Sequence, residues 1–131
     1  GWVRDGGRGL PALLDGSHLQ HRRFRRGIGH DGTMFRHVVM FSWADDVDDA
    51  HIAAVSAALD TLPGTIDVLR AYRHGPDVGI SDGNFDYVVV ADLDNADDFA
   101  TYRDHPDHVA VIQGLLAGRV EQRAAVQYET S

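Results

Sequence analysis

The sequence predicts an α+β domain in which helices cover one face of an antiparallel sheet. Three observations support this fold class. Apolar β-runs begin at Phe35 and Phe85, and another follows Gly118, so the strands are spread along the chain. Two stretches between them carry apolar residues at helical spacing. The 131 residues, of which 44% are hydrophobic, suit a single domain with one core.

Residues 1–33 differ in composition from the rest of the chain. They hold eight of the 14 glycines, and six arginines against three aspartates give them a net charge of +3. We expect a flexible arm, an upstream extension or an expression remnant here, followed by a folded domain at 34–131. Six arginines against 17 acidic residues give that domain a net charge of −11. This acidic body argues against nucleic acid as a partner, in spite of the arginine cluster at 22–26.

Two features that the sequence lacks exclude further classes of protein. The chain has no cysteine, which excludes a disulfide framework and a thiolate metal site. No apolar run approaches the roughly 20 residues that cross a bilayer, so we expect no membrane partner. A cytoplasmic location is consistent with both observations.

The first half of the domain reads as strand, helix and strand. Residues 35–43 are apolar on both faces, which is typical of a covered strand. The aspartates at 45–49 suit a helix N-terminus, and the helix then carries an apolar stripe. Pro63 and Gly64 end it. Residues 66–73 alternate as a second strand, and the loop 75–84 follows. The stripe consists of Ile52, Val55, Leu59 and Leu62.

The second half reads as strand, broken helix and strand. Residues 85–92 form the third strand, and 94–103 form a short helix. A new helix begins at His105–Pro106, because proline is tolerated in a first turn, and it runs to about Leu116. Gly118 ends it, and 119–130 form the last strand, with Val120, Ala124, Val126 and Tyr128 mostly on one side. The order β-α-β-β-α-β is the ferredoxin-like pattern, with a four-stranded antiparallel sheet.

The face of the sheet away from the helices is also apolar. Val38, Met40, Leu69 and Ala71 are expected on it. Left in water, they would form an exposed apolar patch, which two sheets packed face to face would bury. The sequence therefore predicts a homodimer.

Three segments carry a resemblance to a known family: 35–41, 85–90 and 102–108. Together they resemble the stress-responsive A/B barrel (Dabb) family over essentially all of 34–131 and none of 1–33. The resemblance implies a dimeric α/β barrel made from two ferredoxin-like halves. One plant member of the family closes a linear polyketide into an aromatic ring. By motif position, its catalytic tyrosine and histidine match Tyr102 and His108, and its strand-one histidine matches His37.

The residues themselves suggest a chemistry for these three positions. His108 shares a helical stripe with Ile112 and lies in a first turn, where the positive helix end disfavours imidazolium. A neutral imidazole there could act as a general base. Tyr102 could donate a hydrogen bond to a carbonyl whose charge grows in the transition state. We therefore predict catalytic roles for His108, Tyr102 and His37, in a cavity between sheet and helices. We predict its ligand-binding residues to be Val39, Phe41, Phe99, His105 and Ile112.

Simpler roles are possible for the same residues. His37 and His108 could be core histidines with satisfied hydrogen bonds, and Tyr102 an ordinary core aromatic. His105 could simply cap a helix. His105 and His108 have the spacing of half a metal site, but the sequence offers no third ligand. We therefore predict neither a metal nor a cofactor.

Three classes of function remain open. The first is a protein that binds a small apolar or aromatic ligand. The second is a cofactor-free cyclase or isomerase that uses His108 and Tyr102 on a polyketide-like substrate. The third, which rests on analogy of fold alone, is a haem-handling or oxygen-using barrel enzyme.

Overall fold

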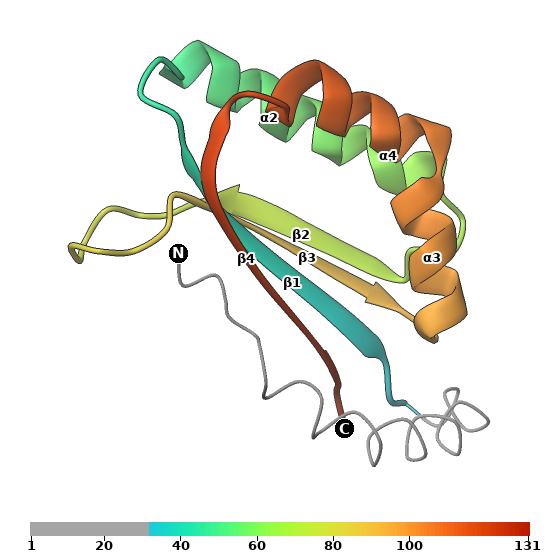
Figure 1. Ribbon diagram of the computed structural model, residues 1–131. Helices are drawn as coiled ribbons and strands as arrows, with labels where there is room; N and C mark the ends of the chain where they lie inside the picture. The colour runs from blue at the N-terminus through green and yellow to red at the C-terminus, as the bar shows by residue number, and fades with distance from the viewer. Residues whose placement is uncertain (1–31) are drawn as a thin grey trace, which may run out of the picture.

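The computed structural model describes residues 32–131, and residues 1–31, which hold most of the predicted arm, lie outside the described part. The fold is α+β and ferredoxin-like, as predicted. Its sheet is made of β1 (Phe35–Trp43), β2 (Ala71–Pro76), β3 (Tyr87–Leu93) and β4 (Val120–Glu129). The strands are antiparallel and lie in the order β2-β3-β1-β4. The helices all cover one face of this sheet (Figure 1).

One layer of helices covers that face (Figure 1). Helix α2 (Asp49–Thr61) begins where Asp48 accepts a hydrogen bond of 2.9 Å from the backbone N–H of His51, so the aspartate run does cap the helix. A short 3-10 turn, η2 (Leu62–Gly64), follows it. Helix α3 (Ala96–Asp104) gives way at His105 to α4 (Pro106–Val111) and then to a π-helical turn, η3 (Ile112–Leu116). The predicted break at His105–Pro106 is therefore confirmed.

The core lies between the helices and the inner face of the sheet. Its fully buried residues come from α2, the turn after it, and β3, and they include Val55, Leu62, Ile66, Tyr87 and Leu93. On β1 the inward positions are the odd-numbered ones, among them Phe35 and Phe41. Because side chains alternate along a strand, the same parity turns His37 and Val39 inward.

The second strand begins later than the sequence pattern predicts. Residues 66–73 alternate, but β2 covers only Ala71–Pro76. The backbone from Leu62 to Leu69 forms local hydrogen bonds instead of ladder bonds. The N–H of Ile66 donates to the carbonyl of Leu62, and the N–H of Leu69 donates to that of Ile66. Ladder pairing starts at Arg70, whose N–H donates to the carbonyl of Asp92. Ile66 and Leu69 therefore pack against the core from a turn, and Leu69 does not lie on the outer face.

The last strand carries an irregularity that alternation alone hides. Ser42 pairs with Gln122 but Trp43 pairs with Val120, so β4 contains one extra residue at this point. A bulge of this kind shifts the alternation, so residues on its two sides point to opposite faces from those that an unbroken strand would give. Val120 consequently lines the inner side of the sheet, opposite to Ala124 and Val126, whereas we predicted them on one side.

A chain of polar groups, partly buried, ties α2 to the sheet. Asp60 and His74 are 2.8 Å apart, His74 Nδ1 and the Tyr87 hydroxyl are 2.8 Å apart, and that hydroxyl is 2.7 Å from Ser56 Oγ. Because the Asp60 carboxylate can only accept, His74 Nε2 is the donor in that contact. Every group in this chain is therefore satisfied.

Replacing Tyr87 with phenylalanine is expected to destabilise the fold by about 1–3 kcal/mol, because Ser56 and His74 would lose a buried partner. The ring stack of Tyr87 on Phe41, with centroids 5.5 Å apart, would remain. Urea unfolding followed by circular dichroism at one fixed protein concentration measures the change. Ile80→Val is the control, since Ile80 is 84% exposed in the loop after β2 and should shift stability by less than about 0.5 kcal/mol. Equal stability of the two variants would contradict the prediction.

Candidate functional site

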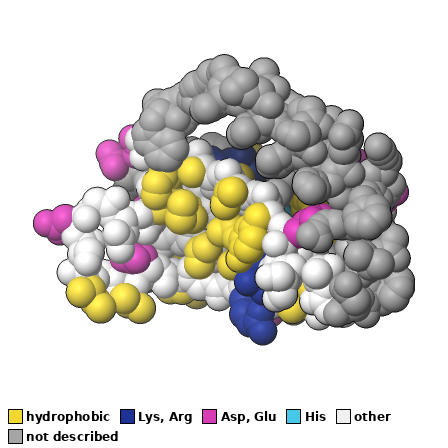
Figure 2. Space-filling view, turned by 90° about the horizontal axis from the view of Figure 1, so that it is seen from below, with side chains coloured by type: hydrophobic (Ala, Val, Ile, Leu, Met, Phe, Trp, Pro, Cys, Tyr) yellow, Lys and Arg dark blue, Asp and Glu magenta, His cyan; other side chains and the backbone are white. Residues whose placement is uncertain are grey.

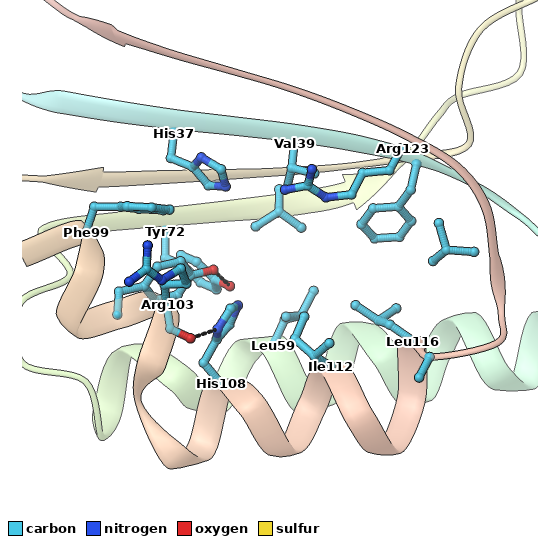
Figure 3. Close-up of a pocket in the computed structure, with 15 residues that line it drawn as sticks. His37, Val39, Leu59, Tyr72, Phe99, Arg103, His108, Ile112, Leu116 and Arg123 are labelled. Atoms are coloured by element: carbon cyan, nitrogen blue, oxygen red, sulfur yellow. Dashed lines mark hydrogen bonds between the residues drawn. The ribbon is translucent and has the colours of Figure 1, made fainter. Parts of the chain in front are cut away.

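A cavity of about 300 Å³ lies between the inner face of the sheet and the broken helix (Figure 3). Its size is at the lower end of the range for small-molecule sites. Most of its lining is apolar, and the polar side chains come from β1, β2, α3, α4 and β4. The lining residues are His37, Val39, Phe41, Leu59, Tyr72, Val89, Phe99, Tyr102, Arg103, His108, Ile112, Leu116, Ala117, Val120 and Arg123.

The break in the helix positions His108. His105 has extended backbone angles and its Nδ1 accepts a hydrogen bond of 3.0 Å from the N–H of Asp107, so it caps α4. Pro106 takes the first helical position, where its missing N–H leaves no bond unmade. The resulting corner brings His108 Nδ1 within 2.9 Å of the Arg103 carbonyl. It also sets the His108 ring against Tyr102, with centroids 4.3 Å apart.

The contact with Arg103 fixes the tautomer of His108. A carbonyl oxygen can only accept, so Nδ1 carries the proton and donates it. In the neutral ring Nε2 then holds a lone pair and can accept a proton. Burial lowers the pKa of His108 below its ordinary value of 6.5, and neighbouring His105 lowers it further, against the opposing effect of the Arg103 bond. The imidazole is therefore neutral at physiological pH and available as a base.

His37 has the opposite hydrogen-bonding character. The side-chain amide of Gln127 on β4 donates to His37 Nδ1 over 3.0 Å, so the neutral ring carries its proton on Nε2. Only 6% of His37 is exposed, and its ring lies against Phe99 with centroids 4.7 Å apart. Burial lowers the pKa of His37 to about 4, and the positive charge of Arg123 contributes. His37 thus offers a donor where His108 offers an acceptor.

Two tyrosines meet at the wall of the cavity. The hydroxyls of Tyr72 on β2 and Tyr102 on α3 are 2.8 Å apart. Burial raises the pKa of each phenol above its ordinary value, so both are protonated. Their bond raises the pKa of Tyr72 and lowers that of Tyr102, which assigns Tyr72 as the donor and Tyr102 as the acceptor. The second hydrogen is therefore left to be donated, and a ligand oxygen in the cavity could accept it.

The structure brings together most of the predicted site residues. His37, Tyr102 and His108 line one cavity, together with Val39, Phe41, Phe99 and Ile112. His105 is the exception: it caps α4 and is not among the lining residues, because its ring turns back to the N–H of Asp107.

Sequence reasoning missed three polar residues of the lining, Tyr72, Arg103 and Arg123. Tyr72 stood in the predicted second strand, but nothing in that strand shows which residue it meets across the cavity. Arg123 pairs with Phe41 across β1 and β4 and so shares the inward face. The register of the last strand, which only the fold supplies, is the signal that would have found it.

The comparisons with known proteins decide the family. The family model described as the stress responsive A/B barrel domain matches residues 35–130. The chain belongs to this family. No curated protein matches it.

Two solved structures with the same fold are also similar to this Dabb chain in sequence. One is a dimeric ferredoxin-like protein of unknown function from Thermobifida fusca, with 41% identity and a TM-score of 0.70, covering 76% of this chain and 92% of that one. Another, from Bacteroides fragilis, is also described as dimeric and of unknown function, with 33% identity and a TM-score of 0.64, covering 74% and 96%.

A hydroxynitrile lyase from Passiflora edulis shares the fold alone, with 15% identity, a TM-score of 0.65, and coverage of 75% of this chain and 94% of that one.

Within residues 32–131, no helix of this Dabb chain has both the length and the apolar character needed to span a membrane.

Proposed function

We propose that this Dabb domain binds a small apolar or aromatic ligand with an oxygen acceptor, held in the cavity between sheet and helices. The observation that carries the proposal is the distribution of polarity in the lining. Apolar side chains such as Val39, Phe41 and Ile112 surround the space, while the hydrogen-bonding groups of His108 and the two tyrosines converge on it. Ligand sites commonly combine an apolar wall with a few placed polar groups that fix orientation.

The free hydroxyl hydrogen of the tyrosine pair supplies the orienting contact. A carbonyl oxygen that accepts it would replace a hydrogen bond to water with one in a partly dry site. Removing the donor leaves the ligand oxygen without that partner, and such a loss weakens binding by about 1 kcal/mol, or roughly fivefold.

Tyr102→Phe is therefore expected to weaken binding of para-hydroxyacetophenone, an aromatic ketone, by about fivefold. Calorimetric titration of the purified protein measures it. Tyr128→Phe is the matched control, because Tyr128 lies on the outer face and contacts Arg36 at 3.3 Å. An unchanged affinity in Tyr102→Phe would contradict the assigned donor, and no heat with wild type would contradict ligand binding by the cavity.

A second candidate function, proton transfer next to a carbonyl, is favoured by the tautomer of His108. With Nδ1 held by the Arg103 carbonyl, Nε2 is the atom that can take a proton from the carbon beside a ligand carbonyl. The electron pair left behind moves onto the carbonyl oxygen, where the tyrosine hydroxyl donates to the enolate. Return of the proton to another atom gives isomerisation, and attack of the enolate carbon on a second carbonyl gives ring closure. This is the cyclase or isomerase chemistry that the family resemblance suggests.

The haem-handling alternative has less support from the cavity. A volume of about 300 Å³ suits a ligand smaller than a porphyrin. The imidazole nitrogens that could ligate iron are also engaged in part, with Nδ1 of both His37 and His108 in hydrogen bonds to protein groups.

We further propose that the chain self-associates through the outer face of its sheet. Val38 on β1 pairs with Val90 on β3 and with Val126 on β4, so these valines form a continuous apolar row across the sheet. Val126 is 57% exposed. Figure 2 shows hydrophobic side chains gathered at the centre of this face. Two copies packed face to face would cover both rows, and the similar solved structures from Thermobifida fusca and Bacteroides fragilis are described as dimeric.

A further inference from the structure

Two arginines line the cavity, and they differ in their partners. Arg103 on α3 holds the carboxylate of Asp104 with two contacts, 2.8 Å from Nε and 3.0 Å from Nη2. Its guanidinium also lies over the Phe99 ring, 5.9 Å from the centroid. Arg103 is thus already paired with an acid of its own chain, and its charge is balanced.

Arg123 on β4 has no such partner among residues 32–131. Its inward position follows from its register opposite Phe41. In Figure 3 its side chain runs from β4 along the sheet as far as Val39, in the direction of His37. The fifteen residues that line the cavity include no aspartate and no glutamate. The described part of the chain therefore provides the cavity with a positive charge but no acid to balance it.

The neighbours of Arg123 add to this positive character. His37 and His108 are the other titratable imidazoles of the lining, and both are held in the neutral form. The proton on His37 Nε2 makes that ring a donor on the side toward which Arg123 points. An anionic ligand group that pairs with Arg123 would meet a second donor and no repelling charge.

We propose that the cavity takes a small apolar or aromatic monocarboxylate, whose carboxylate pairs with Arg123 and whose apolar body lies against Val39, Phe41 and Ile112. This inference rests on the proposed ligand-binding function and deepens it by naming the chemical class of the ligand. The planar guanidinium presents parallel N–H groups that match the two oxygens of a carboxylate. Arg123 lines the cavity and is exposed, so it can bind an acid without moving a buried group.

A phosphate is a poorer fit to the same lining. Phosphate sites usually draw on the backbone N–H groups of a glycine-rich loop or of a helix N-terminus. The lining contains no glycine, and the first turn of α4 is closed by His105, which accepts the N–H of Asp107. A single guanidinium suits a single negative charge.

The test compares two probes of similar shape, para-hydroxybenzoate and para-hydroxyacetophenone, which differ in carrying a carboxylate or a methyl ketone. Wild type should bind the acid more tightly than the ketone. Arg123→Gln should weaken the acid by about tenfold and the ketone by less than about twofold, as expected for loss of one charge-assisted contact at a partly exposed site. Arg123→Lys, which keeps the charge without the fork, should fall between. Calorimetric titration measures all affinities.

Controls and outcomes separate this inference from the function on which it rests. Arg73→Gln removes an exposed arginine on the outer face of β2 and should leave both affinities unchanged. Added salt should weaken binding of the acid and spare the ketone. If the ketone binds and Arg123→Gln leaves the affinity for the acid intact, the carboxylate assignment is overturned while ligand binding stands. If neither probe binds wild type, both proposals fail.

Discussion

Replacing His108 with alanine is expected to slow enolisation of para-hydroxyacetophenone by about 10²–10⁴-fold, the usual contribution of one general base. Enolisation is the half-reaction common to isomerisation and ring closure, and it can be followed without knowing the natural substrate. In heavy water, each proton that leaves the methyl group next to the carbonyl is replaced by deuterium. Loss of the methyl proton signal in nuclear magnetic resonance spectra therefore gives the rate directly.

The pH dependence of this rate follows from the pKa of His108. Burial lowers that pKa below 6.5, and only the unprotonated ring can accept a proton. The pH at which the catalysed rate falls to half its maximum should therefore lie below 6.5. A half-maximal rate at a pH above 6.5 would mean that another group is the base.

His105→Asn supplies the matched control for the loss at His108. Asparagine is a good N-cap, so the start of α4 should be preserved, and His105 does not line the cavity. Its exchange rate should equal that of wild type. An equal rate in His108→Ala would remove the proposed catalytic role, and a His108→Ala protein that unfolds would assign the histidine to stability instead.

Much of the fold could be predicted from the sequence because its signals are local. The aspartates before α2, the apolar stripe from Ile52 to Leu62, and His105–Pro106 each specify their element through neighbouring residues. The start of β2 could not be predicted in this way. Ile66 and Val68 alternate with Asp67 as a strand would, yet the N–H and the carbonyl of Ile66 are both committed to turn bonds. Burial beneath a turn and burial in a strand give the same alternating pattern.

The site residues likewise fall into those that local patterns indicate and those that only the assembled fold brings to the cavity. His37 could be assigned to the inner face from the period of β1, and Tyr102 and His108 from the period of the broken helix. The hydrogen bonds that give these groups their chemistry join distant parts of the chain: Tyr72 to Tyr102 and Gln127 to His37. Arg123 reaches the cavity through the pairing of β4 with β1. Strand pairing is set by the fold as a whole, so no local pattern could reveal these partners.

Val38→Arg is expected to convert a dimer of this chain into monomers. Val38 lies at the centre of the outer face, between Val90 and Val126, where the opposing sheet would bury it. A guanidinium placed there would lose its hydration without gaining an acidic partner, which costs several kcal/mol. Each subunit carries one such arginine, so the dimer would bear this cost twice. In the monomer the same arginine is solvated, so the fold itself should survive, as circular dichroism can verify.

Sedimentation velocity at equal protein concentration gives the state of assembly. Ala54→Arg is the matched control: it adds the same charge at an exposed position of α2, in the helical layer away from the outer face, and should remain a dimer. The two variants carry equal net charge and differ only in the surface that bears it. A monomeric wild type, or a Val38→Arg protein that sediments as a dimer, would show that this face is not where two copies meet. The apolar row from Val90 through Val38 to Val126 would then need a different cover.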